Sequence, residues 1–400
     1  MFSLNKSFIV LLFFSTFLAF VVNFGILAYG PFLLLGFFVI CNNFFKTGTL
    51  SKKDFYTFIG ITPFILLCLS SYILHPYQDK FFNTHILALL VIYPLIVSIQ
   101  YVNTLSDDRR VDFLYNLLKY FIYFQIFVCV GQALNYIVGI GFYIPEEFRD
   151  SKMIPGTFAN ANDLATVLVL ILYSILNLEK SLSGKKFVFL IILIFILIII
   201  CASRVALILS ILLFIFRSGF NFYKFLKSFL ILALSGLMLV VLAKTIMGDT
   251  FNRALLRLEA IKDIATQGFS SDNSASIRTL SYEFFLNNLG QLGFGTFEVN
   301  NYSTFANTTD ASYINELMFQ NPHSLIVEVG YWLGYIGLIF LSLFIFSLIK
   351  NHNKNKFLLL FLFLTLTNIP SSILGNFLFF SFFVLTCIFK YPKTSDFRNE

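Results

Sequence analysis

Apolar runs of membrane-spanning length recur along the whole chain and constrain its fold more than any other feature. Of the 400 residues, 58% are hydrophobic and 12% are charged, and the mean hydropathy is +0.82. A run of ~20 apolar residues crosses a bilayer as a helix, because a helix satisfies its backbone hydrogen bonds without water. We therefore predict an all-α polytopic membrane protein, with one integral membrane domain over residues 1–400. The twelve expected spans lie near residues 8–23, 26–41, 55–74, 82–102, 113–140, 159–177, 187–202, 204–220, 225–246, 323–349, 357–370 and 372–389.

The distribution of basic residues predicts the orientation of these spans. With the N-terminus inside, eighteen Lys and Arg residues fall in inner segments and nine fall in outer segments. Because cytoplasmic loops carry the excess of positive charge, we expect both termini in the cytoplasm. The long loop 247–321, between the ninth and tenth spans, is then outside. The net charge of +7 resides mainly in short loops and does not indicate a nucleic-acid partner, and Lys119 lies inside a predicted span.

One pair of spans is ambiguous, because residues 187–220 could also form a single long helix. Lys185 and Lys186 precede this stretch, and Arg217 lies near its far end. Basic residues at both ends favour two helices whose ends share the cytoplasmic side. The sequence therefore favours a hairpin with its turn just before Arg204.

The outer loop has helical patterning of its own. Apolar residues recur with the period of a helix between residues 251 and 265, and a second helix is expected over 276–288. Gly293-Phe294-Gly295 predicts a turn, and a short third helix is expected over 311–319. The first of these helices is amphipathic, so we expect it to lie along the outer leaflet or to cover a cavity.

The sequence gives no indication of a metal or a cofactor. The five cysteines all fall in apolar runs without a C-x-x-C spacing, so we interpret them as small apolar residues. His75, His85 and His352 have no neighbouring carboxylates in a metal-ligand pattern. A phosphate-binding loop, a dinucleotide fingerprint, G-x-S-x-G and H-E-x-x-H are all missing from the sequence.

The strongest candidate for catalysis is His323, which begins the span 323–349 directly after the long polar loop. An ionisable group where a membrane span begins is a functional candidate. Asn321 and Pro322 fit the cap and the first position of a helix. His323 would then lie in the first turn, where the helix dipole keeps imidazole neutral and able to accept a proton. The alternative is an interfacial histidine without a chemical role.

Three glycines extend the same helix face. Gly330, Gly334 and Gly337 lie within about 40° of His323 on a helix with 100° per residue. Such a face allows close approach by another helix or by a lipid-linked substrate. Glu328, one to two turns deeper, could orient a reaction partner or bond a neighbouring helix.

Three arginines on the predicted outer side are candidates for binding an anionic substrate. Arg204 begins a span, Arg278 lies in the first turn of the second loop helix, and Arg149 lies in the 141–158 loop. A guanidinium group matches phosphate oxygens through a bidentate fork. The alternative is snorkelling or pairing with acids, and it is strongest for Arg149 because three acidic residues lie close to it in the sequence.

Four segments together resemble the motifs of bacterial O-antigen ligases and Wzy-type polysaccharide polymerases. Residues 156–165, G-T-F-A-N-A-N-D-L-A, are similar to the family's G-x-F-x-N-x-N-x-x-A segment, and Ser203-Arg204 resembles its Ser-Arg at a helix start. Residues 277–295, from Ile-Arg to Gly-Phe-Gly, resemble its Arg-helix-GxGxx stretch. The family's H-(N/S/Q)-x9-G-x-x-(G/T/Y) motif is matched by His323-Ser324, nine residues, and then Gly334-Tyr335-Ile336-Gly337. Ser324 departs from the commoner Asn within what this motif allows.

The resemblance implies a metal-independent glycosyltransferase with a GT-C-like fold and no cofactor. Its donor would be a glycan on undecaprenyl pyrophosphate, presented at the outer face of the bacterial cytoplasmic membrane. By motif match His323 would be the catalytic base, and Arg204 and Arg278 would hold the pyrophosphate. Arg149 would be a further contact with a weaker match. Membrane lipids are expected neighbours, and a chain-length regulator and a flippase are candidate partners.

Polymerase and ligase share these motifs, so both functions remain open. The polymerase is favoured because polymerases are the more numerous and divergent group, whereas a ligase would transfer the glycan to lipid A core. A flippase or another transporter is a further alternative, and a non-catalytic membrane scaffold is the last. Transporters commonly carry internal repeats and charges at mid-membrane. No repeat is evident here, and the charges cluster at the predicted outer face.

Overall fold

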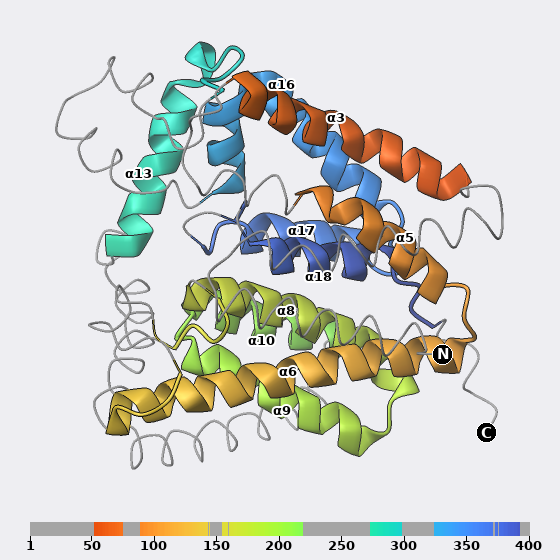
Figure 1. Cartoon of the computed structure of the whole chain (residues 1–400). Helices are drawn as coiled ribbons and strands as arrows, with labels where there is room; N and C mark the ends of the chain where they lie inside the picture. Colours follow the sequence, from red (N-terminus) through yellow and green to blue (C-terminus); the bar gives the residue numbers. More distant parts are fainter. Residues whose placement is uncertain are drawn as a thin grey trace. The chain divides into compact units, whose positions relative to one another are not determined.

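The computed structural model describes residues 52–74, 89–142, 144, 154–158, 160–218, 273–297, 324–370, 373–374 and 376–392. Every regular element within these ranges is a helix (Figure 1), which confirms the all-α prediction for this part of the chain. The chain divides into two compact units. The first unit comprises Met1–Phe24, Val102–Lys262 and Lys390–Glu400, and the second comprises Gly25–Tyr101 and Asp263–Phe389.

Three of the described helices are long and apolar enough to cross a membrane. They are α6 (Asp107–Val138), α8 (Ala161–Leu178) and α16 (Leu325–Ile349). Nine of the twelve predicted spans overlap described helices in whole or in part, and the other three (8–23, 26–41 and 225–246) lie outside the described residues. Of the predicted loop helices, the second corresponds to α13 (Asn273–Asn287), whereas 251–265 and 311–319 lie outside.

In the first unit α8 is the central helix. In α8, 83% of the most apolar 18-residue stretch is buried, whereas in α6 the buried share is 33%. α8 is therefore enclosed by its neighbours, and α6 has a broad exposed face. α6, α9 (Gly184–Ile200) and α10 (Arg204–Ser218) all pack against α8, and the short helix η1 (Glu179–Ser181) leads from α8 towards α9. Such enclosure explains why α8 reads as a near-continuous apolar run rather than as an amphipathic stripe.

The segment 187–220 forms two helices, as the basic residues predicted. α9 ends at Ile200 and α10 begins at Arg204. Ala202, in the turn between them, has a left-handed backbone with φ of 51°. One residue in this conformation breaks a helix, because the left-handed region is unfavourable for residues with a side chain unless the surroundings fix it.

In the second unit α16 packs along α3 (Lys52–Leu74) over much of its length. The two helices approach each other closely at Gly60, where an added Cβ would lie only 1.7 Å from Ser347 Oγ. The rings of Phe64 and Phe344 pack with a tilt of 51° and 5.5 Å between their centroids, and both residues are buried. The remaining helices of this unit are α5 (Ile92–Val102), α17 (Lys356–Leu366) and α18 (Phe377–Ile388), with η3 (Leu289–Gln291) following α13.

Candidate functional site

The glycine of the histidine motif breaks helix α16. Gly334 has φ of 61° and ψ of −155°, so the backbone leaves the helical conformation there. The Gly293–Gly295 turn, which follows α13, enters at this break. A Cβ on Gly334 would lie 2.3 Å from the Gly293 carbonyl oxygen, and one on Gly295 would lie 2.5 Å from the Gly334 nitrogen. Both positions therefore require glycine, for conformation and for space.

The inserted turn satisfies the polar groups that the break exposes. The Thr296 amide donates to the Tyr331 carbonyl at 2.9 Å, and the Phe297 amide donates to the Trp332 carbonyl at 2.8 Å. Ser71 of α3 completes the joint, since its hydroxyl donates to the Phe297 carbonyl at 2.6 Å and accepts from Trp332 Nε1 at 2.7 Å. Because buried backbone groups must be paired, these bonds fix α3, α16 and the turn to one another.

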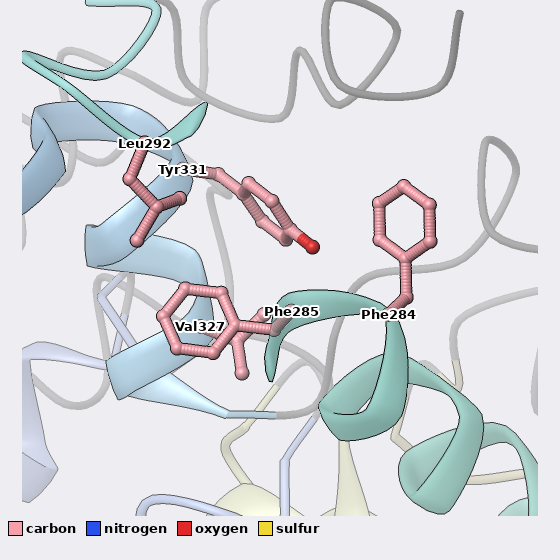
Figure 2. Packing of buried hydrophobic residues seen from close by; sticks show 5 residues of the cluster. All are labelled: Phe284, Phe285, Leu292, Val327 and Tyr331. Atoms are coloured by element: carbon pink, nitrogen blue, oxygen red, sulfur yellow. The ribbon is translucent and has the colours of Figure 1, made fainter. Parts of the chain in front are cut away.

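A hydrophobic cluster holds α13 against the first half of α16 (Figure 2). Its buried members are Phe284, Phe285, Leu292, Val327 and Tyr331. Phe285 meets Tyr331 edge to face at 5.4 Å, and a Cβ on Gly330 would lie 2.6 Å from the Phe285 ring. The sequence left open whether another helix or a lipid-linked substrate approaches the glycine face closely. At Gly330 the close approach is made by α13, and at Gly334 it is made by the Gly293–Gly295 turn.

Arg278 and Tyr282, one turn apart on α13, bind the residues that follow α17. Arg278 Nη2 donates to the Ile369 carbonyl at 3.0 Å. The Tyr282 hydroxyl donates to Asn368 Oδ1, and it lies 2.7 Å from the hydroxyl oxygen of Ser324. One face of α13 is thus joined both to the end of α17 and to the residue that directly follows His323 in the sequence.

The hydrogen bonds that join Ser324, Tyr282 and Asn368 have a defined donor direction. Asn368 donates through its Nδ2 to the Leu364 carbonyl, so its Oδ1 is the atom that accepts from Tyr282. Since the Tyr282 hydrogen is used on Asn368, the Ser324 hydroxyl must be the donor to the Tyr282 oxygen. Ser324 therefore directs its hydrogen at Tyr282, and any third group would meet the lone pairs of its oxygen.

The start of α16 differs from its predicted position. Pro322 was expected as the first helical residue, but the helix begins at Leu325, and Ser324 is its N-cap with an extended backbone (φ −156°, ψ 124°). The prediction that α16 begins at Pro322 is therefore wrong. The physical reason is that the Ser324 hydroxyl is bonded to Tyr282 rather than to a backbone amide of the helix. His323, for which a place in the first turn and a neutral imidazole were predicted, lies outside the described residues.

In the first unit, two glutamines of α6 clamp the Gly156-Thr157 turn. Gln132 exchanges two hydrogen bonds of 2.9 Å with the amide and carbonyl of Gly156. Gln125 accepts from the Thr157 amide at 3.2 Å and donates to its hydroxyl at 2.7 Å. Both glutamine side chains are fully buried. Gly156 has φ of +63°, and a Cβ there would lie 2.6 Å from Gln125 Oε1, so glycine is required.

The rest of this motif begins α8. Asn160 is the N-cap, and its side chain accepts from the Asn162 amide at 2.9 Å. Asparagine is among the best residues for this role because its oxygen pairs with an otherwise unpaired first-turn amide. The segment that resembles the family's glycine-asparagine motif is therefore a clamped turn followed by a capped helix.

The described structure accounts for two of the four predicted site residues. Arg278 is half-buried on α13 in the second unit, and Arg204 is half-buried at the start of α10 in the first unit. His323 and Arg149 lie outside the described residues. Glu328 lies in the first turn of α16 and is only 2% exposed. In the described ranges, no three His, Cys, Asp or Glu residues gather as possible metal ligands.

Four polar residues of these arrangements were missed by the sequence reasoning. Gln125 and Gln132 could have been found, because seven residues correspond to almost two helical turns and place two amides on one face of an apolar span. Tyr282 and Asn368 carry no such signal, since their pairing depends on how α13 and α17 meet. The chain matches no known protein-family model and no curated protein in sequence comparison.

Proposed function

We propose that the protein is a membrane glycosyltransferase that polymerises oligosaccharide repeat units carried on undecaprenyl pyrophosphate. The repeat units would belong to an O-antigen or a capsule. The proposal places about twelve transmembrane helices in the bacterial cytoplasmic membrane, with both termini cytoplasmic and the loop 247–321 on the outer face. The reaction would occur at that face without a metal. These features follow from the sequence pattern and from the family resemblance.

One observation supports the proposal more than any other. Two separate motif segments, the Arg278–Gly295 stretch and the histidine motif, fold into a single arrangement. α13 lies against α16, and the Gly293–Gly295 turn enters the break at Gly334. Within α13, Tyr282 bonds Ser324, the neighbour of His323 in the sequence. Short sequence motifs support a family resemblance more strongly when the segments that carry them also pack against each other in the structure.

In the proposed reaction His323 is the general base. Its imidazole takes the proton of an acceptor sugar hydroxyl, and the oxygen attacks the anomeric carbon of the donor glycan. A glycosidic C–O bond forms while the bond between that carbon and the pyrophosphate oxygen breaks. Undecaprenyl pyrophosphate leaves with the bonding electron pair. Positively charged groups that meet this growing charge lower the barrier.

Arg278 is the proposed phosphate ligand in the second unit. The guanidinium group has five N–H donors in a fixed plane, and the Ile369 carbonyl binds one of them at 3.0 Å. That bond sets the plane of the group before a substrate arrives, which favours bidentate binding of a phosphate. Arg204 and Arg149 are proposed as further phosphate contacts from the motif resemblance alone, and the clamped Gly156-Thr157 turn follows Arg149 in the sequence.

Tyr282 has the proposed role of a positioning residue rather than a catalytic one. It holds Ser324 through a hydrogen bond and is itself anchored on Asn368. The Ser324 oxygen then offers lone pairs in a fixed direction, next in sequence to the base. We infer that this arrangement restricts the orientation of the histidine motif, and that losing it lowers the turnover rate more than substrate binding.

The phenotype of a deletion strain separates polymerase from ligase. Without a polymerase, cells would make surface glycan of a single repeat unit, or only lipid-linked single units. Without a ligase, long chains would accumulate on undecaprenyl pyrophosphate and never reach lipid A core. We expect single units, and accumulation of long lipid-linked chains would replace the polymerase by the ligase. Normal glycan in the deletion strain would remove both functions.

A further inference from the structure

Helix α6 is longer than a membrane is thick. Its 32 residues correspond to about 48 Å at 1.5 Å per residue, whereas the hydrocarbon core of a bilayer measures about 30 Å. The helix starts with charged residues at positions 107–110, and its first apolar stretch begins after them. The N-terminal part of α6 therefore projects beyond the hydrocarbon, and the membrane surface crosses the helix further along its length.

Two lysines mark the level at which the membrane surface crosses α6. Lys119 of α6 places its Nζ 5.3 Å from the ring centroid of Tyr115 and 4.5 Å from that of Tyr120. Lys186, in the first turn of α9, places its Nζ 5.4 Å from the same Tyr115 ring. Lysines and tyrosines gather where hydrocarbon meets water, because their long side chains reach the headgroups. Two ammonium groups from two helices thus approach one aromatic ring.

Acidic partners for these cations are missing from the described part of the chain. Lys119 donates to Asn116 Oδ1 at 3.1 Å, and neither lysine forms an ion pair with a described carboxylate. Two like charges near one ring repel each other, and an anion between them removes that repulsion. The ring face attracts the cations but does not neutralise their charge.

The adjoining surface of α6 and α9 is apolar and exposed. Tyr123 of α6 and Phe189 of α9 meet edge to face at 6.3 Å, with 41% and 48% of each residue exposed. Phe127, one turn further along α6, is 62% exposed. Figure 1 shows α6 and α9 side by side in the first unit. Side chains of this kind match the acyl chains of a lipid next to its headgroup.

We propose that the α6–α9 face binds one anionic phospholipid. The phosphodiester lies between the ammonium groups of Lys119 and Lys186, and the acyl chains follow the Tyr123–Phe189 surface. A zwitterionic lipid gains less here, because its own cation stands beside two lysines. This site is separate from the proposed glycosyl transfer, and its test needs no enzymatic assay.

The test measures lipid binding by native mass spectrometry on the delipidated full-length protein in a non-ionic detergent. Phosphatidylglycerol and phosphatidylcholine with the same acyl chains are titrated separately. The wild type is expected to bind phosphatidylglycerol about 25-fold more tightly, because each of the two lysines near the surface contributes about 1 kcal/mol, or about fivefold, for an anionic headgroup. Lys119→Gln combined with Lys186→Gln should lose this preference.

Lys185→Gln is the matched control, because Lys185 is exposed beside Lys186 and forms no contact with the Tyr115 ring. It should keep the preference for phosphatidylglycerol. Where the double variant does not fold, Lys186→Gln alone carries the test, with an expected loss of about fivefold. Unchanged phosphatidylglycerol affinity in the lysine variants would overturn the proposal. An equal loss in Lys185→Gln would also overturn it.

Discussion

The hydroxyl oxygens of Tyr282 and Ser324, 42 residues apart in the sequence, lie 2.7 Å from each other. This bond connects α13 to the N-cap of α16 and replaces the usual bond between an N-cap serine and its helix. Helix α13 thereby holds Ser324, the residue next in sequence to the proposed base.

Replacement of Tyr282 by Phe should lower the turnover number of glycan transfer by about tenfold, a barrier increase of roughly 1.4 kcal/mol. The ring remains in place, but the hydroxyl that holds Ser324 and binds Asn368 is lost. The KM for the lipid-linked donor should change little, and the pH dependence of the turnover number should shift. Steady-state kinetics over a pH series measure all three quantities.

Tyr335→Phe is the matched control for this variant. Tyr335 on α16 donates its hydroxyl to the Leu289 carbonyl, so the substitution also removes one tyrosine hydrogen bond between the same parts of the second unit. It lies away from Ser324, and its kinetics should stay close to wild type. Equal losses in the two variants would mean that Tyr282 contributes only to folding.

Gly334→Ala should destabilise the protein severely. The new Cβ would lie 2.3 Å from the Gly293 carbonyl oxygen, and φ of 61° with ψ of −155° is unfavourable for alanine. Conformational strain of this kind costs about 1–3 kcal/mol, and the clash adds to it. Thermal unfolding in detergent should show a marked loss. Gly184→Ala is the control, because nothing lies within 4 Å of its Cβ position. An equal loss of thermal stability in this control would contradict the close contact between Gly334 and the Gly293–Gly295 turn.

His352 should make the stability depend on pH in the acidic range. It lies in the loop between α16 and α17, and burial lowers its pKa from 6.5 to about 4, although Nδ1 binds the Thr386 carbonyl. The nearby Lys354 and Lys356 lower the pKa further. The unfolded chain therefore binds a proton at higher pH than the folded chain does. Stability is intact above pH 6.5, falls as the pH drops from 6.5 towards 4, and levels off below.

The expected loss at pH 4 is about 3 kcal/mol, from 1.36 kcal/mol for each pH unit between the two pKa values. The measurement compares the thermal unfolding of the wild type with that of His352→Gln, which does not titrate. The stability difference between the two should change with pH only below 6.5, in favour of the variant at lower pH. A constant difference over the whole range would contradict the buried neutral histidine.

Replacement of Arg278 by Lys should reduce kcat/KM for the donor by about tenfold or more. Lysine keeps the charge, but a single ammonium group cannot bind the Ile369 carbonyl and both oxygens of a phosphate in one plane. Arg109→Lys is the control, since Arg109 is exposed near the start of α6. Full activity of the Arg278 variant would leave this arginine as a structural contact to α17.

The sequence predicts most of the helical elements because their signals are local. Apolar run length located nine described helices, and basic residues at both ends separated α9 from α10. The periodicity of 276–288 likewise predicted α13 to within a turn at its start. Each of these predictions depends on residues that neighbour each other along the chain.

The features that were missed depend on contacts between distant segments. Nothing in an apolar run shows that Gly334 breaks its helix, because the break is stabilised by the Gly293–Gly295 turn, almost forty residues earlier. The start of α16 moved from Pro322 to Leu325 for a similar reason, since Ser324 bonds Tyr282. Local capping rules treat a helix as isolated, and tertiary hydrogen bonds override them.

The most direct test of the central claim is glycan transfer by His323→Ala. The full-length protein is reconstituted in liposomes with an undecaprenyl-pyrophosphate-linked repeat unit, and the lengthening of the lipid-linked glycan is followed over time. A base that removes the acceptor proton contributes about 10²–10⁴-fold to the rate. We therefore expect transfer to fall by at least about a hundredfold in a variant that still unfolds cooperatively near the wild-type temperature. Transfer at a near-normal rate by that folded variant would contradict His323 as the base.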